Sequence, residues 1–254
     1  MLRRLHVNSL RPGLLELDER QSHHARDVLR LQAGDVVELF DDGGQTTSGR
    51  IVTVAPRVQV EAGVVLTPAA DSVRIVLASA IPKGSRADWM VEKLSELGVA
   101  CFVPLLSARS VVQAGGQNKR QRWQRLAGES AKQCRRAGIM RIEDPSELAQ
   151  VLARHGGAGW FCSTTAGAIS AKQAAEAVGP DCRELLLLVG PEGGWTEAEE
   201  ALMRQRGLTP VSLGTTILRV ETAAMAAAAV AGIMLGVHAS ACLAGDSTRG
   251  HAEA

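Results

Sequence analysis

The residues best suited to do chemistry lie in two short glycine-containing segments near the end of the chain. The first, 190–194, reads GPEGG and directly follows an apolar run at 185–189. The second, 214–221, carries one arginine and one glutamate. Glycines have no Cβ, so the backbone turns tightly there and comes close to a ligand. The candidate catalytic residues in these segments are Arg219, Glu192 and Glu221.

Two strand-loop-helix units hold these segments in place. The uninterrupted apolar run 185–189 predicts a short strand covered on both faces, as in parallel sheets under helices. A second short strand is predicted at 211–213. Thr196, with Glu199 three residues later, has the capping-box spacing that begins a helix, and an alanine-rich helix is predicted at 222–235. Both loops are therefore expected at the carboxyl edge of one sheet, where open α/β folds bind ligands.

Strand and helix signals also alternate upstream. Strands are predicted at 74–80 and 101–105, with a helix at 86–97 between them, and another strand at 159–162. This alternation predicts an α/β domain built on a parallel sheet. Thr164 follows the last of these strands. It lies either in a third loop at the ligand edge or in a helix cap or turn.

Residues 1–70 differ from the rest of the chain in the spacing of their apolar segments. After a predicted helix at 22–30, short apolar segments between turn signals predict the strands of a small β-barrel, at 36–40, 50–54, 58–60 and 64–66. The clearest turn is DDGG at 41–44. A proline and small residues at 67–71 mark the boundary to a second domain, 71–238. The polar tail 239–254 has no periodicity and is expected to be disordered.

One predicted helix, 119–137, concentrates positive charge. At about 100° per residue, its apolar and small residues fall on one side: Trp123, Leu126, Ala127, Ser130, Cys134 and Ala137. The basic residues fall on the other side: Arg122, Arg125, Lys132, Arg135 and Arg136. Few acidic residues balance this charge, so we expect contact with RNA phosphates in preference to an ordinary solvated face.

Composition limits the other classes of function. The 254 residues include 28 Lys plus Arg and 27 Asp plus Glu, a net charge of +1, so nucleic-acid binding must come from local clustering. Five cysteines without a C-x-x-C pair predict buried thiols of a cytoplasmic protein. His23 and His24 have no cysteine or carboxylate beside them at ligand spacing, so no metal site is predicted. No secretory signal is predicted at the start, and the apolar run 223–237 is too short for a bilayer.

Four segments carry a family resemblance: KGSRADWMVEKLSELGVACFVPL, RWQRLAGESAKQCRRAG, LLLLVGPEGGWTEAE and LGTTILRVETAA. They are similar to the RsmE-type RNA methyltransferases of the SPOUT superfamily, which methylate N3 of a uridine in the decoding region of 16S ribosomal RNA. The resemblance implies a parallel sheet with a C-terminal trefoil knot, preceded by a PUA-like barrel. It also implies a homodimer that acts on the small ribosomal subunit and binds S-adenosylmethionine (SAM) in the knot loops. Thr215-Thr216 departs from the family pattern, which has proline and a larger polar residue there.

The resemblance places the cofactor contacts in three loops and the strand ends that precede them. The residues expected to bind SAM are Thr164, Leu188, Val189, Gly190, Pro191, Glu192, Gly193, Leu213, Gly214, Ile217, Leu218 and Arg219. The sulfonium of SAM is cationic, so its site does not need a basic cluster. Other nucleotides fit less well. A Walker A loop needs Lys-Ser/Thr where Gly194 is followed by Trp195, and the spacing is not that of a dinucleotide fingerprint.

The expected target defines the chemistry. Uracil N3 carries a proton and is a poor nucleophile until that proton leaves. Arg219 could donate to a uracil carbonyl and favour the anion. Glu192 or Glu221 could act as the base, and a structural role bonding loop amides is an equal alternative for each.

Two other functions stay open at this point. A SPOUT enzyme acting on another nucleotide, such as a tRNA 2′-hydroxyl, would share the knot. A non-enzymatic RNA-binding or ribosome assembly protein would keep the barrel and the basic helix. The second would not need two glycine loops, so SAM binding separates it from an enzyme.

Overall fold

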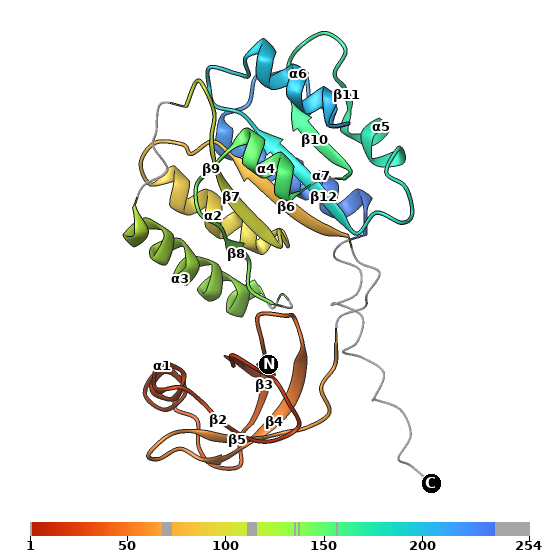
Figure 1. Ribbon diagram of the computed structural model, residues 1–254. Coiled ribbons are helices and arrows are strands. Elements are labelled where there is room, and N and C mark those ends of the chain that lie inside the picture. The colour runs from red at the N-terminus through yellow and green to blue at the C-terminus, as the bar shows by residue number, and fades with distance from the viewer. Residues whose placement is uncertain are drawn as a thin grey trace. The chain divides into compact units, whose positions relative to one another are not determined.

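The computed structural model describes residues 2–67, 73–110, 116–134, 136, 138–155 and 157–236 (Figure 1). The chain divides into two compact units. One comprises Met1–Ala69 with Ala131–Ile139, and the other comprises Ala70–Ser130 with Met140–Ala254. The segment 131–139, which the sequence analysis places with the second domain, therefore groups with the first unit. The predicted tail 239–254 lies outside the described residues.

The first unit is built on a five-stranded sheet in the order β1-β3-β4-β5-β2. β1 and β3 run parallel, and the other pairs are antiparallel. Its strands are β1 (Arg3–His6), β2 (Gly13–Glu16), β3 (Val36–Phe40), β4 (Thr46–Thr53) and β5 (Gln59–Ala62). Alternate strand residues point inward to one apolar core, which includes Leu5, Val37, Leu39, Ile51 and Val60.

The sequence located most but not all of these elements. The strand predicted at 64–66 is wrong: Val64 is exposed, and Leu66 forms only an isolated bridge to Thr46. β1 and β2 were missed, because their sequences, RRLH and GLLE, do not alternate apolar with polar residues. The predicted helix at 22–30 is a short α1 (Glu19–His23) that continues as the π-helix η1 (His24–Val28). Asp18 caps α1 by accepting from the Gln21 amide at 2.7 Å.

The second unit contains an eight-stranded sheet in which every pair is parallel, as the sequence predicted. The order is β11-β13-β10-β12-β6-β7-β8, with β9 beside β7. Its strands are β6 (Arg74–Ser79), β7 (Cys101–Leu106), β8 (Arg141–Ile142), β9 (Ser146–Glu147), β10 (Gly159–Cys162), β11 (Ile169–Ser170), β12 (Glu184–Val189) and β13 (Thr209–Ser212).

Helices cover both faces of this sheet, with α4 on one face and α7 on the other (Figure 1). The helices are α2 (Arg86–Glu96), α3 (Gln117–Cys134), α4 (Leu148–Arg154), α5 (Ala171–Glu176), α6 (Glu197–Gln205) and α7 (Val220–Met234). β12 is apolar from Leu185 to Val189 because it is central and covered on both sides. α7 packs against β6, β12, α2 and α5. Within the described part of the chain, no helix has the length and apolar character needed to cross a membrane.

Candidate active site

Three loops leave the same edge of the second unit's sheet. β10 lies between β12 and β13, and all three strands run in the same direction. The residues that follow them, 163–165, 190–194 and 213–219, therefore start side by side at the carboxyl edge. This arrangement confirms that the two glycine loops share one edge, and it adds the loop after β10 as the third. Open α/β sheets bind their ligands at this edge.

The loop 190–194 is held in one shape by short contacts. The Gly194 amide donates to the Pro191 carbonyl at 2.9 Å, which closes a turn, and Gly194 has φ +70°. A Cβ on Gly190 would lie 2.9 Å from a ring carbon of Trp195, so only glycine fits above the indole. Trp195 Nε1 donates to the Cys162 carbonyl at 2.9 Å, which ties the loop to the end of β10.

The predicted capping box is present, and its glutamate also bonds a segment that is distant in sequence. Thr196 accepts from the Glu199 amide at 3.2 Å, and Glu199 Oε2 accepts from the Thr196 amide at 2.8 Å. The other carboxylate oxygen of Glu199 accepts from the Ala108 amide at 3.0 Å. Glu199 thus joins the start of α6 to the segment after β7.

Arg109, in that same segment, was missed by the sequence analysis. Its Nη1 donates to the Gly193 carbonyl at 2.8 Å and to the Trp195 carbonyl at 3.2 Å. The only local signal is its position in SARS at 107–110, directly after an apolar strand. Its two acceptors lie more than eighty residues away, at separations of 84 and 86.

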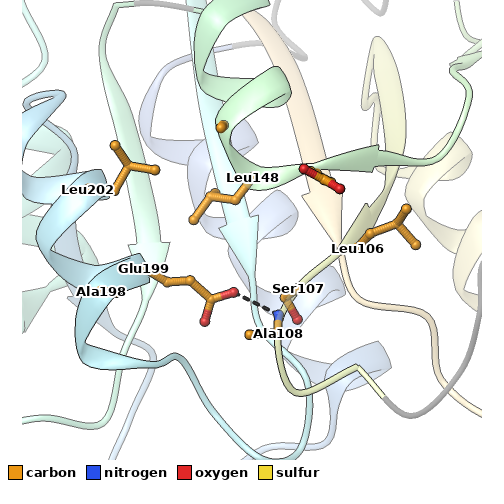
Figure 2. Close-up of a pocket in the computed structure, with 9 residues that line it drawn as sticks. Leu106, Ser107, Ala108, Leu148, Ala198, Glu199 and Leu202 are labelled. Atoms are coloured by element: carbon orange, nitrogen blue, oxygen red, sulfur yellow. Dashed lines mark hydrogen bonds between the residues drawn. The ribbon is translucent and has the colours of Figure 1, made fainter.

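A shallow pocket of about 440 Å³ opens beside this segment (Figure 2). Its walls are α4, α6 and the end of β7, and it is lined by Leu106, Ser107, Ala108, Glu147, Leu148, Ala149, Ala198, Glu199 and Leu202. No residue that the sequence predicted to bind the cofactor lines it. Ala108 and Glu199, which bond each other, both line this pocket.

The second predicted loop, 213–219, is the most exposed part of the edge. The Ser212 hydroxyl donates to the Gly214 carbonyl at 3.0 Å, and Gly214 has φ +151°. Ile217 is 88% exposed, whereas Leu218 is half-buried. Arg219 occupies the N-cap position of α7 with an exposed side chain. Among the described residues, that side chain forms no hydrogen bond or ion pair.

The two candidate carboxylates lie in opposite surroundings. Glu192 is exposed in the glycine loop. Glu221 is only 5% exposed, and its Oε1 accepts from Arg86 Nη1 at 3.2 Å. Its Oε2 is buried and accepts no hydrogen bond from the described residues. Arg86 begins α2, 135 residues before Glu221, so no local pattern predicts that the two side chains meet.

Other predicted cofactor residues are placed as follows. Leu188 and Val189 are buried in β12, and Pro191 is also buried. Gly193 and Gly214 are exposed, and Leu213 is half-buried. Thr164 is exposed and does not cap α5, whose N-cap is Ser170. Beside it, the Ser163 and Thr165 hydroxyls bond each other at 2.7 Å.

Neither Cys101 nor Cys162 is a nucleophile at neutral pH. Burial raises the pKa of the Cys162 thiol to about 12, and burial beside Glu143 raises the pKa of Cys101 to about 11. Both are therefore protonated at neutral pH. The prediction that the cysteines are buried is wrong for Cys134, which is exposed near the end of α3, and Cys242 lies outside the described residues.

The basic face of α3 is partly neutralised. Arg122 pairs with Asp88 at 2.7 Å, and Arg120 pairs with Asp144. Lys119 lies over the ring of Trp123, which is buried as predicted. Arg125 is exposed, and no partner for it occurs among the described residues. It is the predicted RNA-binding residue that remains most available for a phosphate.

The last predicted basic residues are placed differently from Arg125. α3 ends at Cys134, three residues before the predicted end, and Arg135 lies outside the described residues. Lys132 donates to Gln21 Oε1 at 3.1 Å. Arg136 follows the helix, and burial lowers the pKa of its guanidinium to about 10. Its placement does not suit contact with RNA phosphates.

The last residues of α3, from Ala131, belong to the first unit and are capped there by Arg4 of β1. Arg4 Nη1 donates to the Ala131 carbonyl at 3.2 Å and to the Arg136 carbonyl at 3.1 Å. Arg4 also pairs with Glu38 and lies over the ring of Phe40. Cations near the last carbonyls of a helix complement its dipole, so Arg4 stabilises this end.

The histidine pair has a neighbour that the sequence analysis overlooked. His23 Nδ1 lies 2.6 Å from the carboxylate of Asp27, one helical turn away. The described residues contain no group of three or more histidine, cysteine or acidic side chains arranged to hold a metal ion.

Removing Arg86 should destabilise the second unit. Arg86→Ala would leave the Glu221 carboxylate buried without its cation, at a cost of about 2 kcal/mol in the free energy of unfolding. Adding Glu221→Gln should recover at least half of that loss, because a neutral amide is easier to bury. Urea denaturation measures both. Lys172→Ala, which breaks an exposed pair with Glu176, is the control and should change stability by under about 0.5 kcal/mol. A loss equal to the control's would mean that Arg86 does not support Glu221.

Comparison with known proteins agrees with this architecture. The family described as an RNA methyltransferase domain matches residues 69–232, and the RNA methyltransferase PUA domain matches residues 17–60. The ribosomal RNA small subunit methyltransferase E of Bacillus subtilis is 34% identical over 213 residues, which cover 79% of this chain and 82% of that protein. The Mycobacterium bovis protein of the same name is 29% identical and covers 92% of each chain.

Solved structures are similar over nearly the whole chain. A methyltransferase from Legionella pneumophila, solved with bound SAM, superposes with a TM-score of 0.76 at 29% identity, covering 92% of this chain and 98% of its own. The ribosomal RNA small subunit methyltransferase E of Neisseria gonorrhoeae, also bound to SAM, superposes with a TM-score of 0.78 at 26% identity and the same coverage. Three findings agree: the parallel sheet with its three-loop edge, the family match over most of the chain, and these relatives. They show that this chain belongs to the ribosomal RNA small subunit methyltransferase E family.

Proposed function

We propose that this chain is a SAM-dependent methyltransferase that methylates N3 of a uridine in the decoding region of 16S ribosomal RNA. One observation carries the proposal. Arg219, which is exposed and has no side-chain partner among the described residues, lies on a three-loop edge in a chain whose family members are ribosomal RNA methyltransferases. The acting form is a cytoplasmic homodimer, its C-terminal segment forms the family's trefoil knot, and its substrate is the small ribosomal subunit.

The residues at the edge fit SAM. The exposed backbone of Gly193 and Gly214 lets the cofactor approach closely, because neither residue has a side chain. Ile217 and Leu218 offer apolar surface, and the solved relatives from Legionella pneumophila and Neisseria gonorrhoeae hold SAM. Once bound, SAM supplies an activated methyl group.

The chain's own task is to make uracil N3 nucleophilic. The Arg219 guanidinium can donate to a uracil carbonyl and stabilise the charge that grows as the N3 proton leaves. Glu192 is exposed in the glycine loop at the same sheet edge, and we assign it as the carboxylate that accepts that proton. Glu221 is occupied by Arg86, so we assign it a structural part at the start of α7.

A partner subunit would cover apolar surface on α7. Most of that helix is buried, but Ile233 is 74% exposed and Met234 is also exposed. Trp89 is exposed on α2, the helix that packs against α7. Exposed apolar residues on two packed helices are typical of a self-association surface.

Arg219 should act on the transition state more than on cofactor binding. Arg219→Ala is expected to bind SAM almost normally while the rate of methyl transfer falls about 10²-fold to 10³-fold, as when a donor is removed from an oxyanion site. Arg219→Lys should recover part of the rate, since an ammonium lacks the planar fork. Raising the pH should also recover part, because solution then removes the N3 proton.

Single-turnover methyl transfer to small-subunit particles across a pH range measures these effects, with SAM affinity measured separately by calorimetry. Analysis of the product nucleoside must give 3-methyluridine. A 2′-O-methylated product would overturn the proposed function. If Arg219→Ala loses SAM affinity in proportion to rate, Arg219 is a cofactor residue and not a transition-state donor.

The dimer can be tested at Ile233. The wild-type protein is expected to sediment as a dimer at micromolar concentration, and Ile233→Asp as a monomer, because the substitution buries a charge at the interface. Val64→Asp is a matched control on the first unit, where Val64 is 81% exposed. A monomeric wild type, or a dimeric Ile233→Asp variant, would contradict the assignment.

The basic face can be tested at Arg125. Arg125→Glu should lower RNA affinity about tenfold and reduce the slope of log affinity against log salt by about 1, while SAM affinity stays unchanged. Arg206→Glu, an exposed residue at the end of α6, makes the same change in net charge and serves as the control. If the two variants bind RNA with equal affinity at several salt concentrations, the basic face of α3 is an ordinary solvated face.

A further inference from the structure

Arg109 supports the glycine loop from outside the predicted site. A single nitrogen, Nη1, donates to the carbonyls of Gly193 and Trp195, which flank Gly194 on both sides. The stem of the side chain lies along the same loop, since a Cβ on Gly193 would be 3.2 Å from the Arg109 Cβ. Arg109 therefore contacts the loop through both its charged end and its aliphatic part.

These contacts add a constraint to a stretch rich in glycine. Three of the five residues at 190–194 are glycines, and each glycine loses more backbone freedom on ordering than other residues do. The turn between Pro191 and Gly194 fixes one side of the loop, and Arg109 fixes the carbonyls on the other. Charge-assisted hydrogen bonds are stronger than neutral ones, so this is the firmest contact on that side.

Arg109 is itself held in place by its neighbours. The Ser107 carbonyl accepts from the Ser110 amide at 3.0 Å, and the Ser110 hydroxyl accepts from the Ser107 amide at 3.2 Å, which closes a turn around Arg109. The Ala108 amide donates to Glu199, whose other oxygen belongs to the capping box of α6 (Figure 2). The guanidinium therefore projects from a rigid turn at the end of β7.

We propose that Arg109 is a positioning residue that holds the glycine loop in its cofactor-binding shape. The inference rests on the proposed function, because the ligand of that loop is SAM. A loop that is ordered before the cofactor arrives loses less entropy on binding, so affinity is higher. Arg109 touches neither reacting atom. Its removal should raise the Kd and KM for SAM and leave the rate at saturating SAM nearly unchanged.

Three full-length variants test the proposal: Arg109→Ala, Arg109→Lys and the control Arg206→Ala, an exposed arginine without a side-chain partner among the described residues. Calorimetry with SAM should show a Kd about tenfold higher than wild type for Arg109→Ala, with Arg109→Lys between the two, because an ammonium reaches one carbonyl better than two. Arg206→Ala should match wild type. Single-turnover rates at saturating SAM should agree within about twofold for all four proteins.

Each outcome decides the matter. If Arg109→Ala does not fold, Arg109→Lys alone is decisive: a raised Kd with an unchanged saturated rate supports the proposal, and a wild-type Kd overturns it. A Kd for Arg109→Ala equal to that of Arg206→Ala also overturns it, as does a fall in the saturated rate without a change in Kd. Failure of wild-type protein to bind SAM would instead overturn the proposed function.

Discussion

The contact between Trp195 and Gly190 is the constraint on which the site edge depends. The indole fills the space that a side chain at residue 190 would need, and its nitrogen bonds the end of β10. The same ring belongs to the core beneath α4 and α6, together with Leu148 and Met203. The shape of an exposed loop is thereby coupled to the packing of the interior, where density is high and side chains have little freedom.

Much of this edge could be predicted because its causes are local. The run 185–189 has only one way to bury so much apolar surface in a short strand, and it forms β12. Thr196 and Glu199 are three residues apart. This spacing predicts their reciprocal capping, which is present in the structure.

The missed features share a different cause, which is distance along the chain. Arg86 and Arg109 resemble any other surface arginine until the fold brings them to Glu221 and Gly193. The basic face of α3 was overestimated for the same reason. Asp88 lies on another helix, and its pairing with Arg122 cannot be read from the helix itself. Cys134 was placed on the packed side by periodicity, but it is exposed near the end of the helix.

The capping of α3 by Arg4 bears on how the gene for such a protein can be rearranged. The acceptors of the Arg4 guanidinium, the Ala131 and Arg136 carbonyls, are encoded about 130 residues downstream, beyond the segment Ala70–Ser130 of the other unit. A reading frame cut near residue 70 would separate this buried cation from both. The N-terminal barrel is consequently not a cassette that recombination could transplant intact, and its inheritance is tied to the segment 131–139.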